Sequence, residues 1–229
     1  MKRNLALATV AAASALALSF ATPASAITTF TLGSLNSTPT NLYPGPYGTV
    51  TVSDPFSGNT MATVTFTANS VSPFNYTFID NGIADVNVNA TSWTIGSLTT
   101  NGLGGATLTD NGSRQVDGWG TFNQTTQQND GYGSRATSIS FVLTDTSGTW
   151  ASSANVLTPN SLGNTVAAHI AVCDTTDLAN CAQFTGFATN GTGRVPIPEP
   201  ATWAMMLIGF GGLGAVLRSK RRRQRLAIA

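Results

Sequence analysis

Residues 63–67 read Thr-Val-Thr-Phe-Thr, and residues 138–143 read Ser-Ile-Ser-Phe-Val-Leu. Successive side chains of a β-strand point to opposite faces, so this alternation predicts strands with one buried face and one face in water. We predict further strands at residues 49–52, 76–78, 85–89 and 166–172. In the last of these we expect an inward face made of Val166, Ala168, Ile170 and Val172.

Turn signals separate these stretches. Asn-Gly or Asp-Gly pairs stand at residues 81–82, 101–102, 111–112 and 117–118, and such pairs favour the tight turns of β-hairpins. About ten short strands at this spacing are typical of a β-sandwich or jelly roll. A chain of 229 residues has room for one ordinary domain. The sequence therefore predicts an all-β class, with a single β-sandwich or jelly-roll-like domain over residues 27–194.

Charged residues make up only 9% of the chain, against about 25% in an average soluble domain. Their distribution is uneven: residues 27–200 contain three arginines and ten acids, a net charge of −7, whereas the other eight bases lie at the two ends. A negatively charged central part repels the phosphate backbone of nucleic acids. Nucleic acid is therefore not an expected partner.

The N-terminus has the three parts of a secretory signal peptide. Lys2 and Arg3 precede an apolar run at residues 5–20, and Ala24-Ser25-Ala26 offers the small residues that signal peptidase accepts. We predict export through the Sec translocon and cleavage after Ala26, so that residues 1–26 are removed. An uncleaved anchor helix is the alternative, but the apolar run is shorter than the roughly 20 residues of a membrane span.

The C-terminal region has the pattern of a short transmembrane helix. Residues 201–217 contain no charge, and at about 1.5 Å per residue a helix of this length is marginal for a hydrocarbon core of about 30 Å. Six basic residues follow within residues 218–225, and by the positive-inside rule they stay in the cytoplasm. Both ends therefore predict one topology, with residues 27–200 outside the inner membrane and the tail 218–229 inside.

A proline-flanked acid stands directly before this span, in Pro198-Glu199-Pro200-Ala201-Thr202-Trp203-Ala204. Together with the glycine-rich apolar stretch and the arginine cluster that follow, it closely resembles the PEP-CTERM sorting signal in its PEPxxWA variant. Residues 195–229 would then be a stalk plus this signal, with the motif at residues 198–204. The residues that carry the resemblance are Pro198, Glu199, Pro200, Trp203, Ala204, Arg218, Arg221, Arg222 and Arg223.

The resemblance implies recognition by an exosortase, a membrane-embedded cysteine protease or transpeptidase of Gram-negative bacteria that make exopolysaccharide. It further implies a transient stay in the inner membrane, followed by transfer to the cell surface or the extracellular space. A permanent tail anchor behind a proline-rich stalk is the alternative. The glycines at residues 209, 211, 212 and 214 each weaken a helix by about 1 kcal/mol, which suits a segment that a protease unwinds.

Cys173 and Cys181 are the two cysteines of the chain. In an exported protein this spacing predicts a disulfide that closes the loop 174–180. A metal pair is the alternative, but structural zinc usually takes four Cys or His ligands, and His169 is the only histidine.

Catalytic motifs are missing from the sequence. No G-x-S-x-G accompanies His169, and strand parity places this histidine on the face opposite Ile170, where we expect it to be solvated or hydrogen-bonded at an edge. The aspartates stand mostly in turn sequences. Calcium at such turns stays open, although the EF-hand pattern is absent. The sequence predicts no enzyme, no metal and no cofactor.

Two aromatic residues are candidate glycan contacts. Trp119 and Tyr132 each stand between two glycines, so we expect them on exposed loops, whereas Trp93 and Trp150 are expected to fill the core. Two classes of function therefore stay open. The first is a non-catalytic surface or matrix protein associated with exopolysaccharide in a biofilm, and the second is a secreted carbohydrate-binding module.

Overall fold

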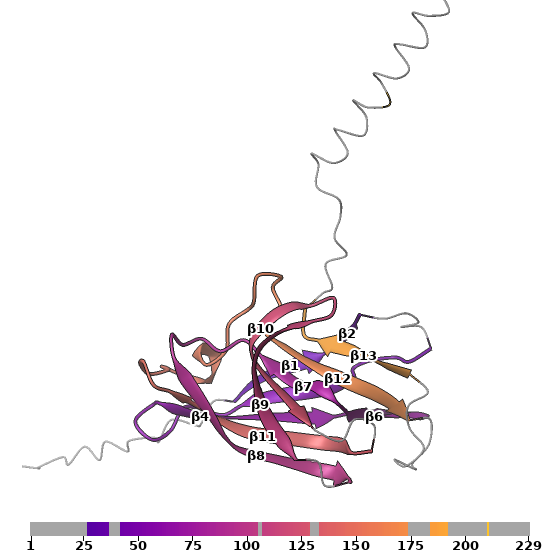
Figure 1. Ribbon diagram of the computed structural model, residues 1–229, viewed down its shortest axis with the longest axis horizontal. Helices are drawn as coiled ribbons and strands as arrows, with labels where there is room; N and C mark the ends of the chain where they lie inside the picture. The colour runs from indigo at the N-terminus through magenta and orange to yellow at the C-terminus, as the bar shows by residue number, and fades with distance from the viewer. Residues whose placement is uncertain are drawn as a thin grey trace, which may run out of the picture.

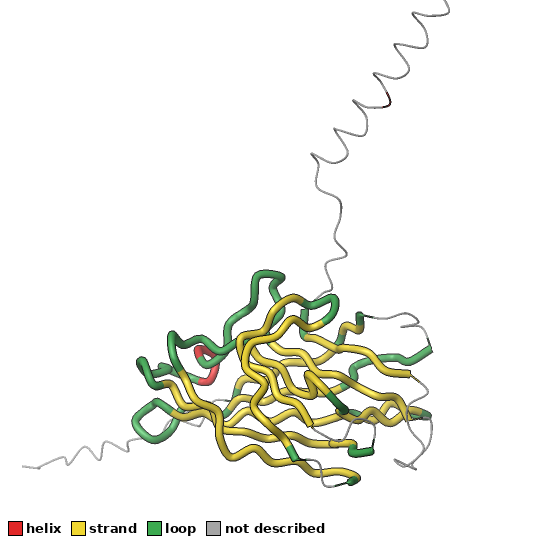
Figure 2. Tube along the Cα trace, viewed as in Figure 1, coloured by secondary structure: helices red, strands yellow, loops and turns green. Residues whose placement is uncertain are grey.

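A computed structural model describes residues 27–36, 42–104, 107–128, 133–173 and 184–191, together with Phe210. Within residues 27–191 it contains thirteen strands and one short 3-10 helix, η1 (Figures 1 and 2). The elements are β1 (Thr28–Leu32), β2 (Ser34–Leu35), β3 (Gly48–Val52), β4 (Met61–Ala68), β5 (Ser70–Val71), β6 (Phe74–Phe78), β7 (Asn81–Val86), β8 (Trp93–Leu103), β9 (Leu108–Val116), β10 (Gly120–Gln128), β11 (Arg135–Asp145), η1 (Ser153–Asn155), β12 (Val166–Cys173) and β13 (Phe184–Thr189).

Among the described residues, the thirteen strands join into one antiparallel sheet. Its main path runs β1-β3-β4-β11-β6-β12-β7-β10-β9, while β8 pairs with β11, β13 pairs with β12 and β2, and β5 pairs with β6. The predicted all-β class is confirmed. The sheet is continuous because β6 is hydrogen-bonded both to β11, through Ala136 and Phe78, and to β12, through Ile170 and Phe78.

The main core explains the alternation in the sequence. In β4 the apolar Val64 and Phe66 are buried, while Thr63, Thr65 and Thr67 lie on the other face, partly or fully exposed. Inward residues of β3, β4 and β11 share one core cluster with those of β7 and β12. Apolar residues from these five strands are therefore buried in one common core. The predicted strands at 49–52, 63–67, 76–78, 138–143 and 166–172 are confirmed.

Strand β12 is buried on both faces along nearly its whole length. As predicted, Val166, Ala168, Ile170 and Val172 face the main core. The alternate residue Ala167 belongs to a second, smaller cluster, which also contains Val116, Trp119, Phe122 and the partly buried Phe187. We call these five residues the second cluster; it covers the face of β12 that the alternation pattern would leave to solvent.

Three of the four predicted turns are wrong. The pair Asp117-Gly118 does form the turn between β9 and β10, but Asn81-Gly82 begins β7, which continues along β12 in the same direction as β6. The pair at 101–102 lies inside β8 and the pair at 111–112 inside β9, each at a register shift against the neighbouring strand. Asn-Gly pairs supply positive φ, and bulges use this conformation as turns do.

The strand predicted at residues 85–89 ends earlier, at Val86. Val88 makes only an isolated bridge to Leu157. The side-chain amide of Asn123 binds the main chain of Val88. Asn123 Oδ1 accepts from Val88 N at 2.7 Å, and Asn123 Nδ2 donates to Val88 O at 2.9 Å. The amide of Asn123 thus replaces the neighbouring strand at this position.

The bulges give a test of the fold with a matched pair of variants. Gly102 and Gly112 both have positive φ, 151° and 60°. A Cβ on Gly102 would overlap the Arg135 carbonyl oxygen, whereas one on Gly112 meets no described atom within 4 Å. We expect Gly112→Ala to lower the free energy of unfolding by about 1 kcal/mol, from backbone strain alone. Gly102→Ala should cost about 3 kcal/mol, because a main-chain shift adds to the strain. Urea unfolding measures both, and equal losses would contradict the bulge geometry.

Candidate functional site

The last described strand, β13, is the element from which the chain continues toward the sorting-signal residues. Asn36 ties this strand to the N-terminal part of the sheet. Its main-chain N donates to Phe187 O at 3.0 Å, and its Oδ1 accepts from Phe187 N at 2.8 Å. Its Nδ2 donates to the carbonyl of Asp117 at 2.9 Å, in the β9–β10 turn. One asparagine therefore joins three separate segments at β13.

The end of β13 is fixed in a similar way. Asn190 Oδ1 accepts from the main-chain N atoms of Thr165 at 2.9 Å and Val166 at 3.0 Å. The hydroxyl of Thr189 donates to Val166 O at 2.7 Å and is buried. The chain is thus held against the start of β12 up to Asn190, a few residues before the predicted stalk that begins at residue 195.

Trp119 is buried, so the prediction that it lies exposed as a glycan contact is corrected. It is 4% exposed, and its indole Nε1 donates to Phe187 O at 2.8 Å. Its own carbonyl accepts from the side-chain amides of Asn160 and Asn164, both at 2.9 Å. Gly118 and Gly120 on either side have φ of 77° and 87°. These positive angles turn the hairpin tip back onto the sheet, and Trp119 then packs into the second cluster instead of facing solvent.

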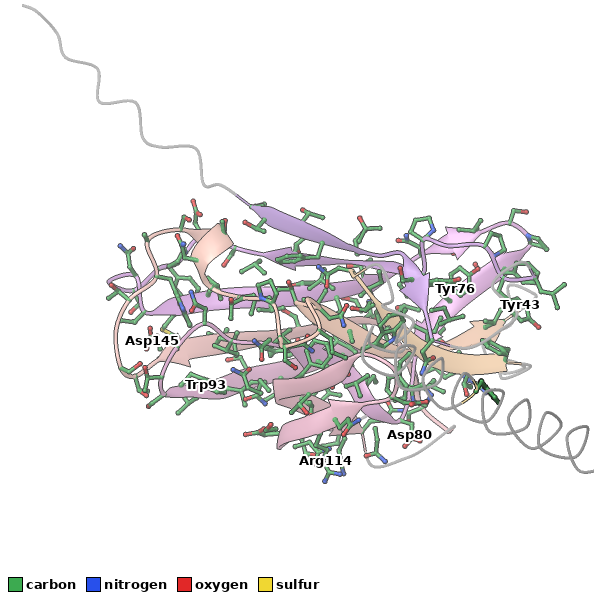
Figure 3. All side chains as sticks on the ribbon, turned by 90° about the horizontal axis from the view of Figure 1, so that it is seen from above. Tyr43, Tyr76, Asp80, Trp93, Arg114 and Asp145 are labelled. Carbon is green, nitrogen blue, oxygen red and sulfur yellow. The ribbon has the colours of Figure 1, made fainter. Side chains whose placement is uncertain are left out.

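The predictions for the other three aromatic residues have different outcomes. Tyr132 lies outside the described residues. Trp150 is fully enclosed in the core, with Nε1 donating to Asn89 O at 2.8 Å, as predicted. Trp93 packs against the core while partly exposed, and its Nε1 donates to Gln124 Oε1 at 2.9 Å. Figure 3 shows Trp93 and Asp145 at one end of the molecule and Tyr43 and Tyr76 at the other.

His169 stacks on β13. Its ring lies 4.4 Å from that of Phe187, at an interplanar angle of 19°. Burial lowers the pKa of His169, and the charge of Asp80 and a hydrogen bond with the Asn81 backbone act in the opposite direction. Within the described part of the chain, its Nδ1 has no hydrogen-bond partner. The expected solvated or edge position is thus corrected to a half-buried one, because Phe187 covers the ring.

A buried acid stands in β7, opposite Ala167 of β12. Asp85 in β7 is fully buried, and burial raises its pKa well above the usual range. Neither carboxyl oxygen has a hydrogen-bond partner among the residues that the structure describes. Over the same residues, no group of three or more His, Cys, Asp or Glu side chains could hold a metal ion.

Cys173 is fully buried at the end of β12. Cys181 lies outside the described residues. The structure contains no free cysteine in its described part, which fits the disulfide predicted between the two, and this bond stays a prediction.

The sequence alone did not predict which asparagines hold β13 and its surroundings in place. Asn36, Asn160, Asn164 and Asn190 belong to a residue type that is equally common in turns, so no local pattern separates them from turn-formers. Asp85 did carry a signal, since it stands in the apolar context Gly-Ile-Ala-Asp-Val. An acid on an otherwise apolar strand indicates burial, whereas simple alternation over residues 85–89 would place Asp85 on the face in water.

The residues of the sorting signal, and those of the signal peptide, lie outside the described residues, except for Phe210. Of the helical structure that is described, none has the length and apolar character needed to cross a membrane. The assignment of the sorting signal rests on sequence comparison, and the signal peptide stays a prediction. No curated protein matched the chain, and no solved structure matched it either.

A family model did match, that of the PEP-CTERM protein-sorting motif, over residues 196–223. This range contains the motif at 198–204, the apolar stretch and the arginines up to Arg223. The motif implies an exported, membrane-passing protein that is sorted to the surface, with an exosortase as processing partner. The predicted resemblance is confirmed: residues 196–223 match the PEP-CTERM protein-sorting motif.

Proposed function

We propose that this chain is a non-catalytic surface or extracellular-matrix protein, which an exosortase frees from its C-terminal signal and which then associates with exopolysaccharide. The observation that carries the proposal is the sorting motif at residues 196–223, placed directly after an all-β part of the chain. We further infer that the continuous sheet folds as a sandwich around its main core.

The short distance along the chain supports a processing role. Asn190 is still hydrogen-bonded to the sheet, and the proline-flanked acid stands at residues 198–200. The eight residue steps from Asn190 to Pro198 span at most roughly 25–30 Å when fully extended. Before cleavage the folded part is therefore kept next to the membrane, and only cleavage lets it move into the surrounding matrix.

Intact-mass measurement of the exported protein tests this proposal. We expect a chain that begins at Ile27 and ends near Pro198-Glu199-Pro200, without Trp203 and the arginine cluster. In a strain without the exosortase, the chain should keep its C-terminus to Ala229 and stay in the inner membrane. Peptides covering residues 203–217 in fully exported wild-type protein would show that the segment is not a sorting signal.

A second variant separates processing from membrane arrest. Changing the basic residues of 218–225 to serine removes the charges that hold the span, each of which costs about 2.5–3.5 kcal/mol at the bilayer centre. We expect this variant to pass through the membrane with its C-terminus intact, even when the exosortase is present. Normal cleavage in this variant would mean that the basic tail is dispensable.

The disulfide is a further part of the proposal. We expect peptide mapping without reductant to recover Cys173 and Cys181 in one cross-linked pair. In the chain-entropy model such a small loop contributes roughly 2–3 kcal/mol, so reduction should lower the Tm by roughly 5–10 °C. Two free thiols in natively exported protein would refute the bond.

Glycan binding is the second candidate function, and one feature of the sheet favours it. An uncharged hydroxyl row crosses five paired strands, through Thr29 (β1), Thr51 (β3), Thr65 (β4), Ser140 (β11) and Thr99 (β8). Thr65 and Ser140 exchange a hydrogen bond of 3.0 Å, and Thr29 and Thr99 are exposed. Hydroxyls at a strand spacing of about 4.8 Å could bind a neutral, repeating glycan.

Threonine-to-valine variants on this row test the second function. We expect the double variant Thr29→Val/Thr51→Val to lose binding on a glycan array, because valine keeps the shape and removes the hydroxyl. The matched control is Thr121→Val, an exposed threonine of β10 outside the row. Trp119→Ala is unsuitable, since the indole holds β13 and its loss would disturb the fold. Unchanged glycan binding in the double variant would eliminate this row as a binding surface.

A further inference from the structure

The carboxyl group of Asp85 is the least satisfied polar group in the described structure. It is fully buried, and both oxygens lack a hydrogen-bond partner there. Asp145 provides a contrast within the same sheet. That side chain is also buried, but its Oδ1 accepts from the main-chain N atoms of Ser147 and Gly148, both at 2.8 Å, and from the Ser147 hydroxyl at 2.8 Å. A buried carboxylate needs such donors, and Asp85 has none.

Asp85 of β7 lies in the same sheet as β13, with β12 between the two strands. In the sheet it stands opposite Ala167 of β12 and Thr125 of β10. A Cβ built on Gly82 would lie 3.1 Å from Asp85 Oδ2 and 3.0 Å from the Phe187 ring. The carboxyl group and the ring therefore border the same small space beside Gly82. Phe187 belongs to β13, so this strand forms part of the cover over the acid.

Few charged groups surround Asp85. Strands β10 and β13 contain no titratable side chain, and Asp85 is the only one in β7. Strand β12 contributes His169, stacked on Phe187, and its buried Cys173, while Asp80 precedes β7. Arg114 of β9 stands opposite Phe122 and is exposed. Within the described residues, then, no cation partners the carboxyl group.

An ionised carboxylate in such a place is strongly disfavoured, so the folded protein keeps Asp85 protonated far above the pH at which it would ionise in water. Burial accordingly raises the pKa of Asp85. In an opened or unfolded chain the same group ionises with a pKa of about 3.9. Opening therefore releases a proton at every pH between these two pKa values. Over that range the closed state loses stability as the pH rises.

We propose that Asp85 is a proton-controlled latch for β13. While its carboxyl carries a proton, β13 stays packed over it, and ionisation opens this strand locally and not the whole sheet. Strand β13 is the part of the cover that yields, because beyond β12 it pairs only with the two-residue β2. Its other attachments are individual hydrogen bonds, from the main chain of Gly33 and Asn36 and from the side chains of Asn36 and Trp119.

Opening of β13 would lengthen the chain between the sheet and the sorting signal. This consequence rests on the proposed function. Release of residues 184–191 adds roughly 25 Å of extended chain between the sheet and the motif. An alkaline surrounding would thus lengthen the tether, and an acidic one would keep it short. The latch itself is tested on purified protein without exosortase, so its failure and that of the sorting proposal are distinguishable.

Amide hydrogen exchange of the full chain in detergent, from pH 5 to pH 9, tests the latch. The opening constant of β13, corrected for intrinsic exchange, is compared between the parent protein and Asp85→Asn. The contribution of His169 titration is present in both proteins, so it cancels in the ratio of the two opening constants. The contributions of Tyr47 and Tyr76 cancel in the same way. Burial raises the pKa of both tyrosines, and for Tyr76, where the charge of Tyr47 adds to the effect of burial, it reaches about 12. We expect the ratio to rise about tenfold per pH unit over part of this range, as release of one proton requires.

Asp145→Asn is the matched control, because it neutralises a buried carboxylate that has its hydrogen-bond donors. It should leave the pH dependence of β13 opening as in the parent. A parent-to-Asp85→Asn ratio that stays flat from pH 5 to pH 9 would overturn the latch. A rise that appears equally in the amides of β4 would also overturn it, since Asp85 would then act on global unfolding and not on β13.

Discussion

Asn36 exchanges two hydrogen bonds with the main chain of Phe187, one through its own backbone and one through its side-chain amide. The fold depends on amides used in this way. Backbone donors and acceptors at strand ends must be satisfied once they are buried, and this chain has few charged side chains for the purpose. Asn123 at Val88 and Asn190 at the start of β12 have the same role. Each of them holds together segments that are distant in sequence.

This dependence explains which parts of the fold could be predicted. Strands β4 and β11 follow from sequence because each buries one face, and burial of one face imposes a period of two. Strand β12 was predicted as a strand, but its second buried face was not. Ala167 is small and gives no sign of whether Trp119 or solvent covers it. The amide contacts were equally invisible, since they join residues far apart in the sequence.

The Asn-Gly pairs show a related limit. Positive φ at glycine is a property of local sequence, but whether the chain then reverses depends on its pairing partners. At residues 81–82 the chain goes on along β12, because β6 and β7 both pair with that strand. For the functional site, the sorting motif was readable because it is a linear signal, whereas Trp119 was misplaced because its environment is made by β13 and the loop containing Asn160.

The scarcity of basic residues has a consequence for survival outside the cell. Between Ile27 and Asn190 the chain contains no lysine and two arginines, Arg114 and Arg135. Arg135 is buried, and both arginines lie within paired strands, β9 and β11. Enzymes of the trypsin type cut after basic residues and need a locally opened chain, which they find in loops and termini and not in a paired strand. The described strands of the sheet therefore offer such enzymes almost no substrate.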